Sequence, residues 1–223
     1  MLSAAAFIAA TNFSQNIFCH AYRAGGRGRA LALGAPANRE MAFKVILIGP
    51  IRVGKSTVGR LLSARLGLPQ RSLDIIFDSY LDDLGYDRRH AARLKEQGFY
   101  ELTKYWKPFE PYGVERLVSE PGDAVIDLGG GHSIYEDDAL FARVKKALSP
   151  FPNVILLMPS PDLEESISIL NERTGGYVSN GYDFHESFVR SRCNYELARR
   201  VVYTKGKTPE ETCAEVEKSL VYS

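Results

Sequence analysis

The stretch "FKVILIGPIRVGKSTVGRLLSARLG", residues 43–67, decides the fold of this chain. It opens with a short apolar run that ends in glycine, which is typical of a buried strand in a parallel sheet. Its second half places four apolar residues on one helical face, Val58, Leu61, Leu62 and Leu66, and Gly67 ends that helix. The stretch therefore predicts a strand, a glycine-containing loop and an amphipathic helix, in that order.

The loop between strand and helix satisfies the pattern G-x-x-x-x-G-K-[ST] with Gly49, Gly54, Lys55 and Ser56. The glycines permit positive φ and let backbone N–H groups close around phosphate oxygens. Lys55 would place a cation near the β- and γ-phosphates, and Ser56 would offer a hydroxyl to Mg²⁺. The positive end of the helix, with Thr57 in its first turn, points to the same place. We therefore predict that this loop binds the phosphates of a nucleotide together with Mg²⁺, rather than being a glycine turn with an incidental lysine.

Apolar strands alternate with amphipathic helices along the rest of the chain, and there is no internal repeat. Further strands are expected at 123–129, 153–160 and 200–204, and helices at 137–147, 162–173, 186–198 and 209–221. This alternation predicts a parallel sheet covered by helices on both faces. We expect one doubly wound α/β domain of the P-loop type over residues 41–223.

Residues 1–40 differ in composition from the rest of the chain. They are rich in alanine and arginine and contain no acidic residue before Glu40. That composition suits either sequence upstream of a true start at Met41 or an organellar transit peptide. In both cases we expect a disordered N-terminal extension, because the segment has too little apolar periodicity to bury.

The overall composition excludes several classes of protein. With 45% hydrophobic and 25% charged residues, the chain of 223 residues matches an ordinary globular protein. Its net charge of +1 gives no broad attraction to nucleic acid or membrane. No apolar run approaches the roughly 20 residues of a membrane span. Three cysteines form no paired framework, which fits a reducing compartment. We expect a cytoplasmic protein, or an organellar one if a transit peptide is present; monomer and dimer both stay open.

A second glycine cluster, "VIDLGGGHS", ends another predicted strand. Because the carboxyl ends of parallel strands share one crevice, this cluster should face the phosphate loop. Gly129, Gly130 and Gly131 would let a substrate approach bare backbone donors, or they form a flexible turn. Asp127 is similar to the Mg²⁺-directing carboxylate of many nucleotide-binding proteins, although a turn or cap hydrogen bond would also explain it. His132 beside the glycines could contact a substrate, but we interpret it as a surface residue that follows a turn.

These motifs, in this order, resemble shikimate kinase. The resemblance rests on "GPIRVGKSTVGRLLSARLGLP", "VIDLGGGHSIYED", "NERTGG" and "RCNYELARRVVYTKGKTPEET", and it covers nearly all of the chain from Met41 onward. It implies transfer of the γ-phosphoryl group of ATP to a hydroxyl of a small carboxylated ring. It also implies a five-stranded parallel sheet, a substrate-binding insertion at 75–118 and a lid at 173–185.

The resemblance further implies roles for individual residues. Asp74, in "SLD", matches the acid that contacts the substrate hydroxyl and could act as the base. The three consecutive glycines match glycines that contact the substrate. Arg173 matches the arginine that packs on adenine, and Pro209 matches a proline beside that ring. Arg192 matches the arginine that holds the substrate carboxylate.

The chain also departs from the family pattern at three places. Ser72 stands where the family has a metal-placing acid, and Asp127 would take over that role. In the insertion, "GFYELT" has Tyr100 in place of a clamping arginine and Thr103 in place of an acid. The lid segment "GGYVSNGYDFHE" contains no arginine. Because tight, oriented binding of a carboxylate needs fixed guanidinium donors, these departures weaken the case for shikimate itself.

The insertion is rich in aromatic residues, which either pack this subdomain or stack on a planar ring of a substrate. Two prolines, Pro108 and Pro111, should break any helix there. The leading hypothesis is a small-molecule kinase with a hydroxyl acceptor. A nucleoside or nucleotide kinase and a non-catalytic ATP-dependent switch are the alternatives. The aromatic positions are Tyr80, Tyr86, Tyr100, Tyr105, Trp106, Phe109 and Tyr112.

Overall fold

The computed structural model describes residues 42–222, apart from the side chain of Asp83. The expectations for residues 1–40 lie outside this described part. Within it, none of the helices is both long and apolar enough to cross a membrane.

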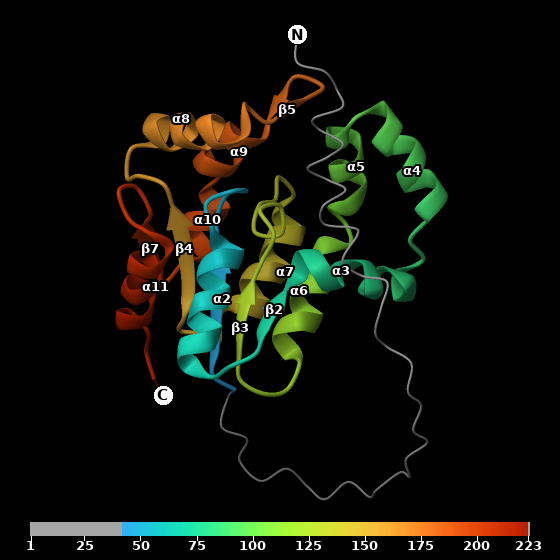
Figure 1. The fold of residues 1–223 in the computed structure, drawn as a ribbon. Helices are drawn as coiled ribbons and strands as arrows, with labels where there is room; N and C mark the ends of the chain where they lie inside the picture. The colour runs from blue at the N-terminus through green and yellow to red at the C-terminus, as the bar shows by residue number, and fades with distance from the viewer. Residues whose placement is uncertain (1–41, 223) are drawn as a thin grey trace, which may run out of the picture. The chain divides into compact units, whose positions relative to one another are not determined.

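A five-stranded parallel sheet forms the centre of the described residues, in the strand order β2-β3-β1-β4-β7 (Figure 1). All five residues of β1 and all five of β4 are buried, which is why β4, and β1 after its first residue Lys44, are continuous apolar runs without alternation. The predicted parallel α/β architecture is confirmed. The short edge strand β2 was not predicted, because its polar sequence carries no strand pattern. The strands are β1 (Lys44–Ile48), β2 (Gln70–Ser72), β3 (Ala124–Asp127), β4 (Val154–Met158) and β7 (Arg200–Tyr203).

Helices cover both faces of this sheet. Helices α2 (Lys55–Leu66) and α11 (Pro209–Lys218) pack against each other on one face (Figure 1). On the other face, α7 (Asp138–Leu148) packs between α6 (Glu110–Ser119) and α10 (Arg192–Leu197). Later strands are added on both sides of β1: β3 and β2 on one side, β4 and β7 on the other. In such a sheet a ligand is expected in the crevice at the carboxyl ends of β1 and β3, where the order of the strands changes direction.

The segment expected as the insertion, 75–118, contains a series of short helices after β2 and also most of α6. They are α3 (Leu73–Leu81), a 3₁₀ turn (Asp82–Leu84), α4 (Arg88–Gln97) and α5 (Phe99–Trp106). Helix α5 ends before Pro108 and α6 carries Pro111 in its first turn, so the predicted break at the prolines is confirmed. The aromatic rings of the insertion contact one another: Tyr86 stacks on Tyr105, and both meet the ring of Phe109 edge-on.

The segment expected as a lid contains a small hairpin after helix α8 (Leu163–Thr174). Strands β5 (Val178–Ser179) and β6 (Tyr182–Asp183) pair antiparallel. They turn at Asn180 and Gly181, both at positive φ, which is the backbone geometry that Asn-Gly favours in two-residue hairpins. The ring of Tyr182 stacks on Tyr100 of α5 with centroids 4.4 Å apart, so the hairpin contacts the insertion.

The single helix predicted for 186–198 is wrong, because the structure divides it into α9 (Phe184–Arg190) and α10. Ser191, between the two helices, has an extended backbone with ψ of 120°. The side-chain amide of Asn194 donates to the Phe188 carbonyl at 2.9 Å, and Asn194 accepts from the Ser133 hydroxyl at 2.7 Å. A side chain therefore satisfies a carbonyl that a continuous helix would give to a backbone amide.

Candidate active site

The loop after β1 has the backbone geometry of a phosphate cradle. Gly49 has φ of 136°, and a Cβ there would lie 2.3 Å from the Leu157 carbonyl oxygen, so only glycine fits against β4. Gly54 has φ of 109° and begins α2 without a side-chain cap. The uncapped first turn of α2 presents backbone N–H groups and the positive end of the helix dipole toward the loop. This arrangement suits an anion such as a phosphate.

Lys55 lies inside this loop. Its ammonium donates to the carbonyls of Gly49 and Pro50, both at 2.8 Å, and the residue is 7% exposed. Burial lowers the pKa of Lys55 to about 8, against the opposing influence of the Asp74 and Asp127 carboxylates. A cation that is held by two neutral carbonyls and is poorly solvated has much to gain from phosphate oxygens.

Asp127 ends β3 beside the loop and accepts three hydrogen bonds. The hydroxyls of Ser56 and Ser72 both donate to its Oδ1 at 2.9 Å, and the Gln70 amide donates to Oδ2 at 2.7 Å. Ser72 and Asp127 are direct register partners on the adjacent strands β2 and β3. The Asp127 carboxylate therefore lies beside Ser56, in a region that an acidic side chain at position 72 would also reach.

These oxygens fit a magnesium ion that accompanies a nucleotide. When Ser56 donates its proton to Asp127, the lone pairs of the serine oxygen stay available for a cation. Across the described residues, no group of three or more His, Cys, Asp or Glu side chains is placed to hold a metal. Mg²⁺ bound with ATP needs no such group, because phosphate oxygens and waters complete its coordination around one or two protein ligands.

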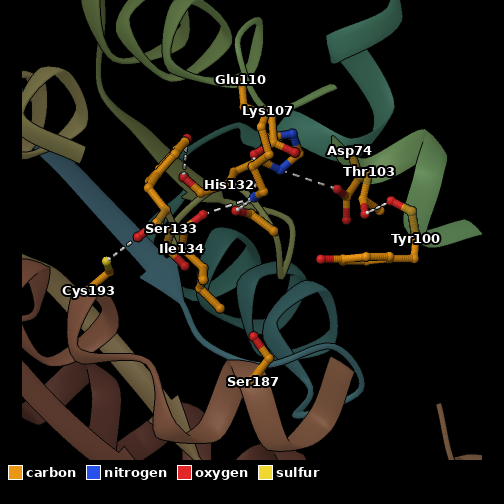
Figure 2. Close-up of polar contacts among 12 residues, drawn as sticks. Asp74, Tyr100, Thr103, Lys107, Glu110, His132, Ser133, Ile134, Ser187 and Cys193 are labelled. Atoms are coloured by element: carbon orange, nitrogen blue, oxygen red, sulfur yellow. Dashed lines mark hydrogen bonds and ion pairs between the residues drawn. The ribbon is translucent and has the colours of Figure 1, made fainter. Parts of the chain in front are cut away.

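Asp74 lies in the first turn of α3 and points toward His132, which follows the second glycine cluster (Figure 2). Its Oδ1 is 3.5 Å from Nδ1 of His132. A Cβ on Gly129 would lie 1.8 Å from that same carboxylate oxygen, so glycine is required for Asp74 to approach the loop. The carboxylate is 63% exposed within the crevice. Partial desolvation raises the pKa of Asp74, and the Lys55 ammonium acts in the opposite direction.

The expectation that His132 is a surface residue is wrong. It is 7% exposed and meets the ring of Phe77 edge-on, because the loop after β3 folds beneath α3. Burial lowers the pKa of His132 to about 4, so the imidazole is neutral at pH 7. Its Nδ1 has no hydrogen-bond partner among the described residues. The sequence carried no signal for this, since a histidine after three glycines has no periodicity to follow.

A cavity of about 260 Å³ adjoins the same glycine loop. Lys107 is held there by three acceptors: Glu110 Oε2 at 2.7 Å, the Gly131 carbonyl at 2.8 Å and the Ile134 carbonyl at 2.9 Å (Figure 2). All three ammonium protons are therefore used within the protein. The residues that line the cavity include Tyr100, Thr103, Lys107, Gly131, Tyr182 and Phe184.

The remaining predicted residues lie at different distances from this cluster. Arg173, at the end of α8, donates to the Arg52 carbonyl at 3.1 Å and so contacts the phosphate loop. Thr57 is exposed in the first turn of α2, and Pro209 is exposed at the start of α11. Arg192 is not brought to the cavity, because its 65% exposed side chain binds Asp138 and Glu196 at the surface. Gly130 packs on Ile51 of the phosphate loop, where a Cβ would lie 2.6 Å from its side chain.

A parallel sheet with a phosphate loop after its first strand, a carboxylate beside the loop serine and a second acid across the crevice defines a P-loop kinase. Comparison with known proteins identifies which one it resembles. The shikimate kinase of Streptomyces coelicolor is 32% identical over 177 residues, which is 75% of this chain and 89% of that protein. The chain belongs to the shikimate kinase family, as its motifs predicted.

Other comparisons agree with this assignment. The shikimate kinase of Streptomyces avermitilis is 31% identical over 187 residues, or 79% of this chain and 95% of that protein. A shikimate kinase from Acinetobacter baumannii, solved in complex with shikimate, has the same fold, with a TM-score of 0.52 and 18% identity. That comparison covers 80% of this chain and 93% of the other. No protein-family model matches the chain.

Proposed function

We propose that this protein transfers the γ-phosphoryl group of ATP to a hydroxyl of a small metabolite. One observation carries the proposal: the Asp74 carboxylate lies against Gly129, at the same strand ends as the cradle that holds Lys55. An acid across the crevice from a phosphate loop is positioned for an acceptor hydroxyl, rather than for holding the nucleotide. A protein that only bound ATP would have no use for it.

The proposed roles follow from the contacts. The loop amides and Lys55 hold the β- and γ-phosphates, and Ser56 and Asp127 would hold Mg²⁺, which neutralises phosphate charge when bound. Arg173, already on the loop, would cover the adenine, and Pro209 would lie beside it. The lid segment at 173–185, which contains the hairpin, would close over the site and exclude water, which otherwise competes as an acceptor.

The reaction needs one base and one in-line displacement. The acceptor oxygen bonds to the γ-phosphorus while the bond to the β–γ bridging oxygen breaks, and ADP leaves with that electron pair. Asp74 takes the proton of the acceptor hydroxyl. Because desolvation raises the pKa of Asp74 above its ordinary value, its carboxylate is a stronger base than an aspartate in free solution.

The cavity beside Gly131 is the proposed acceptor site, and its charges favour an acceptor without a carboxylate. Lys107 already uses its three protons, and Lys104 binds Glu101 at 2.7 Å. Arg192 would have to leave two carboxylates to reach an acceptor. An acceptor carboxylate would thus find no free cation among the described residues that line this cavity. The stacked pair Tyr100 and Tyr182 offers a flat apolar wall instead.

The test is ATP turnover by the full chain in the presence of hydroxyl compounds offered as pairs with and without a carboxylate. Shikimate and its methyl ester form one such pair. We expect an acceptor to accelerate ADP release at least tenfold and to yield a phosphorylated product, with the neutral member of the pair preferred. Lys55→Met is the control and should abolish the acceleration. A nucleoside as the sole acceptor would favour a nucleoside kinase, and ATP binding that no acceptor accelerates would favour a switch.

A further inference from the structure

Arg52, in the middle of the phosphate loop, has a backbone conformation that its side chain opposes. Its φ is +66°, in the left-handed region. Among the described residues only Asn180 shares this feature without being glycine, and Asn180 lies in an Asn-Gly hairpin turn that favours it. Glycine would adopt the Arg52 conformation without strain. A strained residue in a binding loop points to a use for its side chain.

The guanidinium of Arg52 is exposed and makes no hydrogen bond or ion pair with any described residue. Its backbone is nevertheless held, because Arg173 donates to the Arg52 carbonyl at 3.1 Å. The neighbouring cation Lys55 binds two loop carbonyls, so it approaches the loop from the inside. The backbone of Arg52 is therefore held in place, while its guanidinium has no partner among the described residues.

The packing of the phosphate loop indicates which side this cation serves. Ile51, the residue before Arg52, lies against Gly130 of the second glycine cluster, where a Cβ would lie 2.6 Å from the Ile51 side chain. The charges of Arg52 and Asp74 both act on the phenol of Tyr177, in the segment between α8 and the hairpin, which agrees with this contact. At Ile51 and Arg52 the loop therefore borders the side of the crevice where the acceptor hydroxyl would be. This is the side toward which the γ-phosphoryl group travels.

We propose that Arg52 is a catalytic residue whose guanidinium binds the γ-phosphate oxygens of ATP from the acceptor side. The inference rests on the proposed function. During transfer, negative charge spreads over the three equatorial oxygens of the moving group. Lys55 and the loop amides neutralise that charge on the nucleotide side. The planar fork of Arg52 would bind two of the oxygens at once, which an ammonium cannot do.

The decisive variant is Arg52→Gly in the full chain, because relief of backbone strain should raise stability while loss of the charge should lower ATP affinity. Glycine relieves the positive φ, so the thermal unfolding midpoint should rise. Loss of the guanidinium should weaken Mg-ATP binding at least tenfold in calorimetry, while Mg-ADP binding changes less than threefold. Turnover of ATP should fall at least thirtyfold. Arg52→Lys should recover part of the ATP binding without the gain in stability.

Arg60→Ala is the matched control, since Arg60 is an exposed arginine on α2 without an assigned contact. It should leave the ratio of ATP to ADP affinity unchanged. An Arg52→Gly protein with the original affinity ratio and turnover would overturn the inference, as would equal losses for ATP and ADP. The proposed function fails separately, if the unaltered protein binds no Mg-ATP.

Discussion

At the scale of single residues, the site depends on where a few charges sit relative to backbone. Asp127 and Ser72 are register partners, so the carboxylate that we propose to hold Mg²⁺ could stand on either strand without moving the phosphate loop. Gly129 is needed because it has no side chain: a methyl group there would occupy the position of the Asp74 carboxylate. The charged groups of the site thus come from the ends of adjacent strands, and no single position in one motif determines where they lie.

Changing Asp127 to Asn should lower Mg²⁺-dependent turnover at least tenfold, because a neutral amide is a weaker magnesium ligand than a carboxylate. The measurement is the initial rate of ADP formation as a function of Mg²⁺ concentration. The double change Ser72→Asp with Asp127→Ser should recover part of the loss, since it moves the carboxylate one strand across. Near-normal rates in Asp127→Asn alone would show that the aspartate only caps and ties the strands.

The pH dependence of ATP binding should follow Lys55. Its pKa of about 8 lies below the usual 10.5, and a polyphosphate favours the charged form. Binding must therefore take up a proton above pH 8, so affinity should fall by up to tenfold per pH unit between pH 8 and 10. Calorimetry in buffers of different ionisation enthalpy measures that uptake. Lys55→Met should bind weakly without this slope; a flat profile in the unaltered protein would contradict the prediction.

The same shift has a consequence for folding with the opposite direction in pH. Between pH 8 and 10.5 the unfolded chain keeps a proton on this lysine that the folded state has released. The contribution of Lys55 to the free energy of unfolding therefore rises with pH across that window. Affinity for ATP and this contribution to stability change in opposite senses, which separates them experimentally.

At the scale of elements, the break between α9 and α10 couples three parts of the chain. Asn194 on α10 binds the last turn of α9 through the Phe188 carbonyl and the loop after β3 through Ser133. That loop begins with the three glycines of the proposed acceptor site. A buried amide with partners on both sides therefore connects the hairpin end of the domain to the crevice.

Asn194→Leu should lower the free energy of unfolding by about 2–3 kcal/mol, because it leaves a buried hydroxyl and a buried carbonyl without partners. Urea denaturation measures the loss. Tyr195→Phe is the control at the next position: Tyr195 is 40% exposed, its bond to Val189 is long at 3.5 Å, and stability should barely change. Equal stability of the Asn194 variant and the unaltered protein would show that the break does not need this tie.

At the scale of the whole molecule, every residue assigned a role lies between Gly49 and Pro209, within the described part of the chain. We therefore expect the protein that begins at Met41 to keep its ATP turnover within twofold and its unfolding midpoint within a few degrees. Parallel assays on the full chain and the shorter chain check this. A large loss of either would assign residues 1–40 a part in the folded domain.

The sequence by itself determined four strands of the sheet, the helices α2, α7, α8 and α11, the phosphate loop and the family. These depend on local signals: apolar runs, helical periodicity and a motif whose residues are close in the chain. Tertiary structure decided the burial of His132, the edge strand β2, the division of the helix at Ser191 and the surface pairing of Arg192. Each of those depends on partners that are distant in sequence, and no local pattern records such partners.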